Sequence, residues 1–213
     1  MFTGLVTDVG TIVSAEDIAP DLRRLRIASH YDAASIDLGA SIACSGICLT
    51  VTAVEKTAGG SVFQVETAAE TLRRTMARHW QQGTRLNLER SLRIGDEMGG
   101  HLVTGHIDGL ASIHAIVALP PNPNEPWSAT AKFIIDAPVE LARFIAAKGS
   151  ICLDGTSLTV NEVDGARFSV LLIPHTLQVT TWGALQAGDS LHIEVDLMAR
   201  YAARLAEASA QGY

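Results

Sequence analysis

The sequence lacks several features that would place it in a common functional class. Its 213 residues include 16 Lys or Arg against 23 Asp or Glu, and no basic run exceeds Arg23-Arg24 or Arg73-Arg74. Because nucleic-acid surfaces need clustered cations, the net charge of -7 argues against such a partner. No apolar stretch is long enough to span a bilayer, and the N-terminus lacks a charged region followed by an apolar signal core. We therefore expect a cytoplasmic protein with no nucleic-acid or membrane partner.

Cysteine is also scarce. The chain has three, and an odd number without a signal peptide gives no disulfide framework. Cys44 and Cys48 lie in a segment that is typical of one strand, in which four residues span about 13 Å. That distance is too long for a disulfide and makes a shared zinc ion unfavourable. We expect neither a disulfide nor a metal site.

Common cofactor motifs are missing as well. The sequence has no glycine-rich phosphate loop, no dinucleotide-binding fingerprint and no nucleophile elbow. We expect no cofactor. The chain therefore either binds a flat small molecule or acts on one with its own side chains.

What the sequence does contain is an internal repeat. Ser45–Val51 returns as Asp154–Val160, and Gly83–Glu89 returns as Gly188–Glu194. Phe2-Thr3-Gly4-Leu5-Val6 returns at 103–107, and Glu70-Thr71-Leu72 at 175–177. A period of about 100 residues is too long for a solenoid and suits a small domain. We therefore expect a tandem duplication, with domains at 1–97 and 98–196 followed by a C-terminal segment at 197–213.

Each copy is expected to be a small antiparallel barrel. Short segments rich in branched residues end at Gly or Asp, and a turn follows every eight to twelve positions. The candidate strands of the first copy are Leu22–Ala28, Ile42–Val54, Val62–Val65 and Thr84–Leu88. Asp164-Gly165 has the signature of a two-residue hairpin, and Gly59-Gly60 holds the matching place in the first copy.

Helix is expected in two places only. Pro138–Lys148 has proline in its first turn and Gly149 beyond its end. The tail, Met198–Ala210, lacks Gly and Pro, and its apolar residues recur at helical spacing. A helix of about 13 residues is marginal alone, so this stripe packs either on its own barrel or on copies of itself. Pro120–Pro126 is expected to be a loop inserted in the second copy, and Gly95–Gly100 the linker between copies.

Two aligned positions could carry chemistry. In a strand, Ile47, Leu49 and Val51 share the core face, while Cys48 and Thr50 point away from it. The second copy repeats this pattern, with Ser157 and Thr159 on the outer face. Buried cysteine is usually only a small hydrophobic residue. Because Cys48 lies on the other face and aligns with a hydroxyl, we treat it as a candidate nucleophile.

Glycine and histidine give further candidates. Gly4 and Gly105 either form turns or let the backbone approach a flat ligand closely. His106 follows Gly105 where the first copy has Leu5, so it is a candidate general acid or base, with His101 nearby and His175 a weaker candidate. Lys148 either caps the expected helix electrostatically or contacts a ligand. The remaining charged residues are expected to be solvated.

Taken together and in this order along the chain, these motifs resemble those of the riboflavin synthase alpha chain family. The resemblance extends from Met1 to about Asp196. It rests on Met1-Phe2-Thr3-Gly4, Gly46–Val51, Glu70–Arg73, Gly99–His106, Asp154–Val160 and Ile173–Thr176.

The resemblance implies an all-β fold of two homologous six-stranded Greek-key barrels, each binding a lumazine, plus a C-terminal helix that assembles a homotrimer. It implies an active site between the first barrel of one subunit and the second barrel of the next. The reaction would be a dismutation of two 6,7-dimethyl-8-ribityllumazine molecules. Transfer of a four-carbon unit gives riboflavin and 5-amino-6-(D-ribitylamino)uracil without metal or cofactor. Lumazine synthase is implied as a partner. The alternative is a non-catalytic lumazine- or flavin-binding protein on the same fold.

The resemblance also implies a set of substrate contacts. In the first barrel they are Gly4, Leu5, Val6, Cys48, Leu49, Thr50, Glu66, Thr67, Ala68, Ala69, Glu70 and Thr71. In the second they are Gly105, His106, Ile107, Lys148, Ser157, Leu158, Thr159, Leu171, Leu172, Ile173, Pro174, His175 and Thr176.

Catalytic roles are expected at four of these positions. His106, or a hydroxyl–water relay through Ser157 and Thr159, would remove a proton from an acidic methyl group of the lumazine. Cys48 or a water molecule would add to the partner ring. The chain departs from the family at Cys44-Ser45, where Val-Asn is usual.

Overall fold

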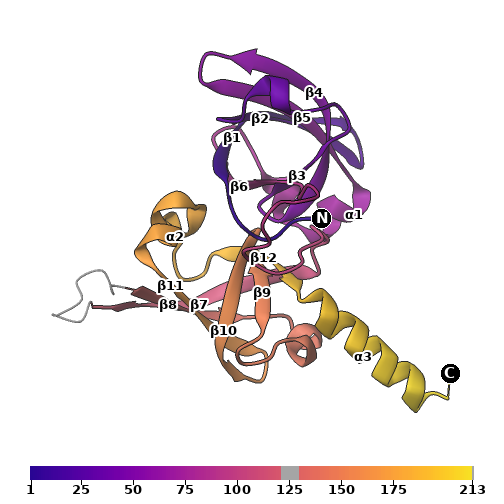
Figure 1. Ribbon diagram of the computed structural model, residues 1–213, viewed down its shortest axis with the longest axis vertical. Coiled ribbons are helices and arrows are strands. Elements are labelled where there is room, and N and C mark those ends of the chain that lie inside the picture. The colour runs from indigo at the N-terminus through magenta and orange to yellow at the C-terminus, as the bar shows by residue number, and fades with distance from the viewer. Residues whose placement is uncertain (121–129, 213) are drawn as a thin grey trace.

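The computed structural model describes residues 1–120 and 130–212 and consists of two β-barrels, one above the other (Figure 1). The first barrel contains β1 (Asp8–Ala19), β2 (Leu22–Ser29), β3 (Ser41–Cys44), β4 (Ile47–Thr57), β5 (Gly60–Ala68) and β6 (Arg85–Arg90). The second contains β7 (Gly109–Leu119), β8 (Thr130–Asp136), β9 (Ser150–Leu153), β10 (Thr156–Asp164), β11 (Arg167–Leu172) and β12 (Ser190–Val195).

Both barrels are closed and have the same strand order. The first runs β1-β2-β5-β4-β3-β6 and then returns to β1. The second has the same cyclic order once each strand is matched to its repeat partner, β7 to β1 through β12 to β6. All pairings between named strands are antiparallel, and the pairs β1–β6 and β9–β10 close the two barrels. The predicted fold, two homologous six-stranded Greek-key barrels with a C-terminal helix, is confirmed.

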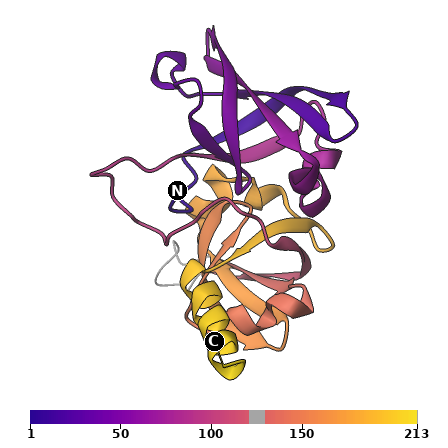
Figure 2. The same ribbon diagram turned by 90° about the vertical axis from the view of Figure 1, so that its right-hand side faces the viewer.

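Each barrel has its own hydrophobic core. In the first, Leu25, Phe63 and Leu88 are fully buried, and in the second Phe133 packs edge-on against Trp182. Leu25, Phe63 and Phe133 alternate with partly exposed residues along their strands, as a barrel with one inner face requires. In β6, by contrast, both neighbours of Leu88 are buried as well. A third, small cluster of Phe2, Ala43, Val103 and Cys152 joins the barrels. The N-terminus accordingly lies between them (Figures 1 and 2).

One predicted strand is two. Ile42–Val54 is interrupted by a turn at Ser45 and Gly46, which have φ of 42° and 84°. Two consecutive positive φ angles are typical of the tight turn that joins antiparallel strands. Cys44 and Cys48 therefore lie on neighbouring strands, and the expected separation of about 13 Å along one strand was wrong. Both cysteines are nevertheless free thiols.

The other local predictions have mixed outcomes. Both hairpins form with two-residue turns, but each turn lies one residue from the predicted pair. The turn residues are Ala58-Gly59 in place of Gly59-Gly60, and Gly165-Ala166 in place of Asp164-Gly165. The helix expected over Pro138–Lys148 is wrong in type and length, because only a 3-10 helix, Val139–Phe144, forms there. Two short helices, α1 (Ala69–Arg74) and α2 (Pro174–Val179), were not predicted. Of the expected loop Pro120–Pro126, residues 121–126 lie outside the described residues.

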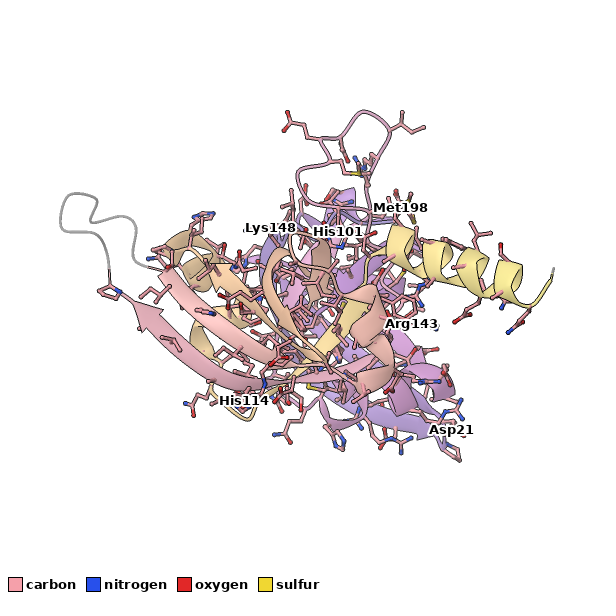
Figure 3. The ribbon with its side chains drawn as sticks, turned by 90° about the horizontal axis from the view of Figure 1, so that it is seen from below. Asp21, His101, His114, Arg143, Lys148 and Met198 are labelled. Carbon is pink, nitrogen blue, oxygen red and sulfur yellow. The ribbon has the colours of Figure 1, made fainter. Side chains whose placement is uncertain are left out.

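The tail forms the predicted helix, α3 (Leu197–Ala210), capped by the Asp196 side chain, which accepts a hydrogen bond from the Met198 N–H. It projects from the second barrel, with Met198 near its start (Figures 1 and 3). None of its residues is buried, and Tyr201 and Leu205 are 61% and 69% exposed. Its apolar stripe therefore does not pack on its own barrel. No helix in the described residues is long and apolar enough to cross a membrane.

Two buried side chains at repeat-equivalent positions tie the barrels together. In β6, the Asn87 amide donates to the Asp154 carbonyl oxygen and accepts from the Thr181 N–H. In β12, His192 makes the corresponding bonds: its Nδ1 lies 2.7 Å from the Ser45 carbonyl oxygen, and its Nε2 accepts from the Met76 N–H. Since a carbonyl only accepts and an N–H only donates, His192 must be neutral with its proton on Nδ1.

This arrangement predicts an acid-sensitive component of stability. Burial lowers the pKa of His192 to about 4, so the unfolded chain takes up a proton between about pH 6.5 and 4 while the folded chain does not. Stability due to His192 is therefore lost as pH falls through that window. In His192→Asn, which copies Asn87, that component should vanish. From pH 7.5 to 4.5 the wild type should lose on the order of 2 kcal/mol more unfolding free energy than the variant in urea titrations.

The wild type must be compared with His192→Asn because a second buried group, the Asp154 carboxyl, also titrates in this pH range. Burial raises the pKa of the Asp154 carboxyl to about 7, and this acts in the opposite sense, adding stability as pH falls. Both proteins contain Asp154, so the difference between them isolates His192. Equal losses in the two proteins would contradict the assignment.

Candidate functional site

The segments that precede the barrels cross over to the opposite barrel. The Gly4 carbonyl oxygen accepts a hydrogen bond from the Ser157 N–H at 2.8 Å. The Gly105 carbonyl oxygen accepts from the Cys48 N–H at 2.9 Å. Phe2 and Val103 pair with each other where the two segments pass. The sequence order grouped Gly4 with Cys48, whereas the structure places Gly4 against Ser157 and Gly105 against Cys48.

The glycines at these crossings are required by the backbone. Gly4 and Gly105 have φ of 76° and 79°. A Cβ on Gly4 would lie 2.6 Å from the Ser157 Cβ, and one on Gly105 would lie 2.5 Å from the Cys48 Cβ. The close approach is therefore to a strand of the sister barrel, where the sequence indicated either a turn or an approach to a flat ligand.

A cavity of about 450 Å³ opens beside Cys48, within the range of small-molecule sites. Its walls come from β4, from the α1 region and from the segment that crosses over from the second barrel. We call it the Cys48 pocket. It is lined by Ile47, Cys48, Glu70, Thr71, Arg74, Thr75, Gly105, His106, Ile107 and Asp108.

The Cys48 pocket contains charges that are paired at its rim. Arg74 and Arg73 contact the Glu70 carboxylate and hold its pKa below the ordinary value. The Asp108 carboxylate contacts Arg200 of α3 at 2.7 Å. His106 is exposed beside them. Because these charges are already paired, the wall suits a neutral ligand better than a strongly charged one.

The equivalent place on the second barrel lies around Ser157. We call it the Ser157 region and define it by Gly4, Leu5, His101, Ser157 and Thr159. The His101 Nδ1 lies 2.7 Å from the Ser157 Oγ. Burial lowers the pKa of His101, so its imidazole is neutral near pH 7 and can accept the Ser157 proton. The sequence suggested His106 over His101, but His101 is the histidine that contacts a candidate hydroxyl.

Lys148 has a strained backbone. Its φ is 66°, a region that costs a non-glycine residue free energy, and its N–H donates to the Val160 carbonyl oxygen. Gly39, with φ of 84°, makes the same bond to Val51 in the first barrel. The expected helix end does not exist there, so the capping explanation for Lys148 is wrong. The Lys148 side chain is exposed, and the bond of its N–H to Val160 places its backbone next to β10, the strand that contains Thr159.

Other predicted contacts divide by the direction of their side chains. Leu49 and Leu172 are buried in the barrel cores, Leu158 packs against the core of the second barrel, and the Thr67 hydroxyl donates to the Arg23 carbonyl oxygen. Glu66 pairs with Arg24 on the outer surface. The remaining predicted positions are partly or fully exposed: Val6, Thr50, Ala68, Ala69, Leu171, Ile173, Pro174, His175 and Thr176.

Sequence reasoning missed three buried carboxylates. Asp154, described above, is 5% exposed, and Glu89 and Glu194 are 6% and 2% exposed, so the expectation that the remaining charged residues are solvated was wrong. Glu89 and Glu194 form a repeat-equivalent pair. Glu89 and Glu194 each accept hydrogen bonds from the crossing segment of their own barrel. The repeat could have indicated these two glutamates, because both copies of the Gly83–Glu89 motif end in Glu. Among residues 1–120 and 130–212, no group of three His, Cys, Asp or Glu side chains is placed to hold a metal ion.

The chain matches a known protein family and several proteins of that family. A family described as "Lumazine binding domain" matches the chain twice, over residues 3–91 and 104–196. The riboflavin synthase of Brucella abortus (strain 2308) is 52% identical over 208 residues, which cover 97% of this chain and 98% of that protein. The riboflavin synthase of Mycobacterium tuberculosis (strain ATCC 25618 / H37Rv) is 38% identical over 208 residues, covering 96% and 98%.

A solved structure shares the fold. The crystal structure of LumP complexed with riboflavin matches with a TM-score of 0.77 at 23% identity, covering 92% of this chain and 99% of that one. At this identity the likeness concerns the double-barrel architecture alone.

Proposed function

The chain belongs to the lumazine-binding family of riboflavin synthases, and on that premise we propose how its two barrels perform the reaction. The activity is a group transfer in riboflavin biosynthesis. Two 6,7-dimethyl-8-ribityllumazine molecules dismutate to riboflavin and 5-amino-6-(D-ribitylamino)uracil. The two products together contain the atoms of two substrates and no others, so no external reactant is needed. The relatives favour this enzyme over the alternative of a non-catalytic lumazine- or flavin-binding protein.

One observation carries the proposal: the chain builds the same crossing contact twice. Cys48 with Gly105, and Ser157 with Gly4, are repeat-equivalent pairs on equivalent strands. A reaction between two molecules of one compound needs two similar binding sites. We propose that the Cys48 pocket binds one lumazine and the Ser157 region the other.

The proposed contacts are the residues that the family resemblance implies, with each crossing segment now grouped with the barrel that it contacts. At the Cys48 pocket they are Cys48, Leu49, Thr50, Glu66, Thr67, Ala68, Ala69, Glu70, Thr71, Gly105, His106 and Ile107. At the Ser157 region they are Gly4, Leu5, Val6, Lys148, Ser157, Leu158, Thr159, Leu171, Leu172, Ile173, Pro174, His175 and Thr176. Where a side chain points into a barrel core, as for Leu49 and Leu172, the contact would be through the backbone.

Each site has groups suited to proton transfer. At the Ser157 region, the Ser157 hydroxyl would take a proton from the acidic lumazine methyl group and pass its own proton to the neutral His101, with Thr159 beside it. At the Cys48 pocket, His106 would move protons at the ring bound there, and the Cys48 thiol would add to that ring and leave again. Holding two rings together supplies much of the acceleration, because it removes the entropic cost of their encounter.

The two sites must face each other for the bound rings to react. In an oligomer, the facing sites can come from two different subunits. We propose domains at 1–97 and 98–196, a homotrimer assembled through 197–213, and active sites between the first barrel of one subunit and the second barrel of the next. The exposed stripe on α3 supports assembly. A biosynthetic role supports a cytoplasmic location, and the shared lumazine intermediate supports association with lumazine synthase.

Replacing Cys48 tests both the activity and its proposed nucleophile. Purified protein given only the lumazine should develop flavin absorbance. Cys48→Ser should lower kcat at least about tenfold, because a hydroxyl is a weaker nucleophile than a thiol, while lumazine binding measured by calorimetry stays within about twofold. Near-normal turnover in the variant would reduce Cys48 to a packing residue. Tight binding without turnover in the wild type would favour a carrier.

A further inference from the structure

We propose that Glu194 and Glu89 are positioning residues that act on the barrel they do not belong to. Glu194, in the second barrel, holds the segment that completes the Cys48 pocket on the first barrel. Glu89, in the first barrel, holds the segment that lies against Ser157 on the second. The proposal rests on the two-site function above and assigns these carboxylates a role in it.

The contacts of Glu194 saturate its carboxylate. Its Oε1 accepts from the Thr104 N–H and from the Thr104 hydroxyl, each at 2.7 Å. Its Oε2 accepts from the Gly105 N–H at 2.9 Å and from the His106 N–H at 3.1 Å. All four hydrogen-bond partners are donors, so both oxygens accept, and an ionised carboxylate is the side chain that satisfies all of them.

Glu89 repeats the arrangement in the first barrel. Its Oε1 accepts from the Thr3 N–H at 2.7 Å and the Thr3 hydroxyl at 2.8 Å. Its Oε2 accepts from the Gly4 N–H at 2.9 Å. Burial raises the pKa of both carboxyls, and the surrounding N–H groups oppose that shift. A buried charge is costly, and a site that builds it twice compensates that cost with several charge-assisted hydrogen bonds.

The anchored segments lead directly to the binding sites. The Gly105 N–H is fixed by Glu194 while its carbonyl oxygen accepts from the Cys48 N–H, and the next two residues, His106 and Ile107, line the Cys48 pocket. A shift of this segment therefore moves the pocket wall and the Cys48 strand together. The same chain of contacts runs from Glu89 through Gly4 to Ser157.

The test uses Cys48 as a reporter for its own pocket. Cys44 and Cys152 are buried whereas Cys48 is partly exposed, so iodoacetamide should alkylate Cys48 selectively. Lumazine bound in the pocket should slow that alkylation. In Glu194→Gln, the amide NH₂ group would face the N–H groups that now donate to the carboxylate. Half-protection, the lumazine concentration that halves the alkylation rate of Cys48, should then rise at least about tenfold. In Glu89→Gln, on the same barrel as Cys48, half-protection should stay within about twofold of the wild type, while kcat falls.

Two further variants keep the test decisive. Glu140→Gln, at an exposed glutamate of the second barrel, should behave as the wild type. Thr104→Val removes one of the four donors to Glu194 and should shift half-protection a few-fold in the same direction. If Glu194→Gln does not fold, the shift in Thr104→Val tests whether the Glu194 anchor shapes the Cys48 pocket.

The outcomes separate this proposal from the function beneath it. A folded Glu194→Gln with unchanged protection, or equal shifts in Glu194→Gln and Glu89→Gln, overturns the crossed assignment while leaving the enzyme intact. If lumazine does not protect wild-type Cys48 and no flavin forms, the proposed function fails. In that case the alkylation rate without ligand still tests the anchor, because only Glu194→Gln and Thr104→Val should change it.

Discussion

Replacing Gly105 with alanine is expected to lower riboflavin formation at least about a hundredfold. The new Cβ would lie 2.5 Å from the Cys48 Cβ and 2.8 Å from the Cys48 N. The residue also has φ of 79°, which costs a non-glycine residue about 1–2 kcal/mol. The crossing segment must move away, which breaks the Cys48–Gly105 hydrogen bond and displaces the wall of the Cys48 pocket. Misplacement of about 1 Å can by itself cost a hundredfold in rate.

The measurement is the steady-state rate of flavin formation, with circular dichroism to confirm that both barrels remain folded. Gly59→Ala is the matched control, because Gly59 lies in the β4–β5 turn, has no positive φ, and has nothing within 4 Å of the place that a Cβ would occupy. It should leave the rate within about twofold. A Gly105→Ala protein with near-normal kcat would show that the crossing contact does not shape the active site.

Removing the tail from Met198 onward is the second change with a very large expected effect. The truncated chain should sediment as a monomer and lose riboflavin formation almost completely. In the single chain, Met198, Tyr201 and Leu205 expose an apolar stripe, and burying such a stripe is what stabilises association. Because the proposed active site needs two subunits, assembly and activity should be lost together.

A point variant separates the stripe from the helix that carries it. Leu205→Lys should weaken both assembly and activity, since it places a charge in the proposed contact. Ala206→Lys, one position along and off the stripe, should retain both. Analytical ultracentrifugation and the flavin assay read the two properties in the same samples. An active monomer from either the truncation or Leu205→Lys would exclude the site shared between subunits.

Local patterns predicted most of the fold. The repeat, the outward position of Cys48 and Ser157 and the terminal helix depend on residue order and on a strand period of two, which sequence displays directly. The failures were also local. The Ser45-Gly46 turn was hidden because Ser is an uncommon residue at positive φ. The segment at Pro138 forms a 3-10 helix that ends at Phe144, where Ile145 becomes extended and buries its side chain in the core of the second barrel.

The sequence by itself determined that two homologous barrels exist, that each presents a polar residue at the same place, and which family this is. Only the tertiary structure decided which segments complete which site. Gly4 meets Ser157 and Gly105 meets Cys48 through hydrogen bonds between residues far apart in the chain, and no periodicity records such pairing. The buried carboxylates of Glu89 and Glu194 depend on the same crossing, because a charge inside a protein is explained only by the donors that the fold brings to it.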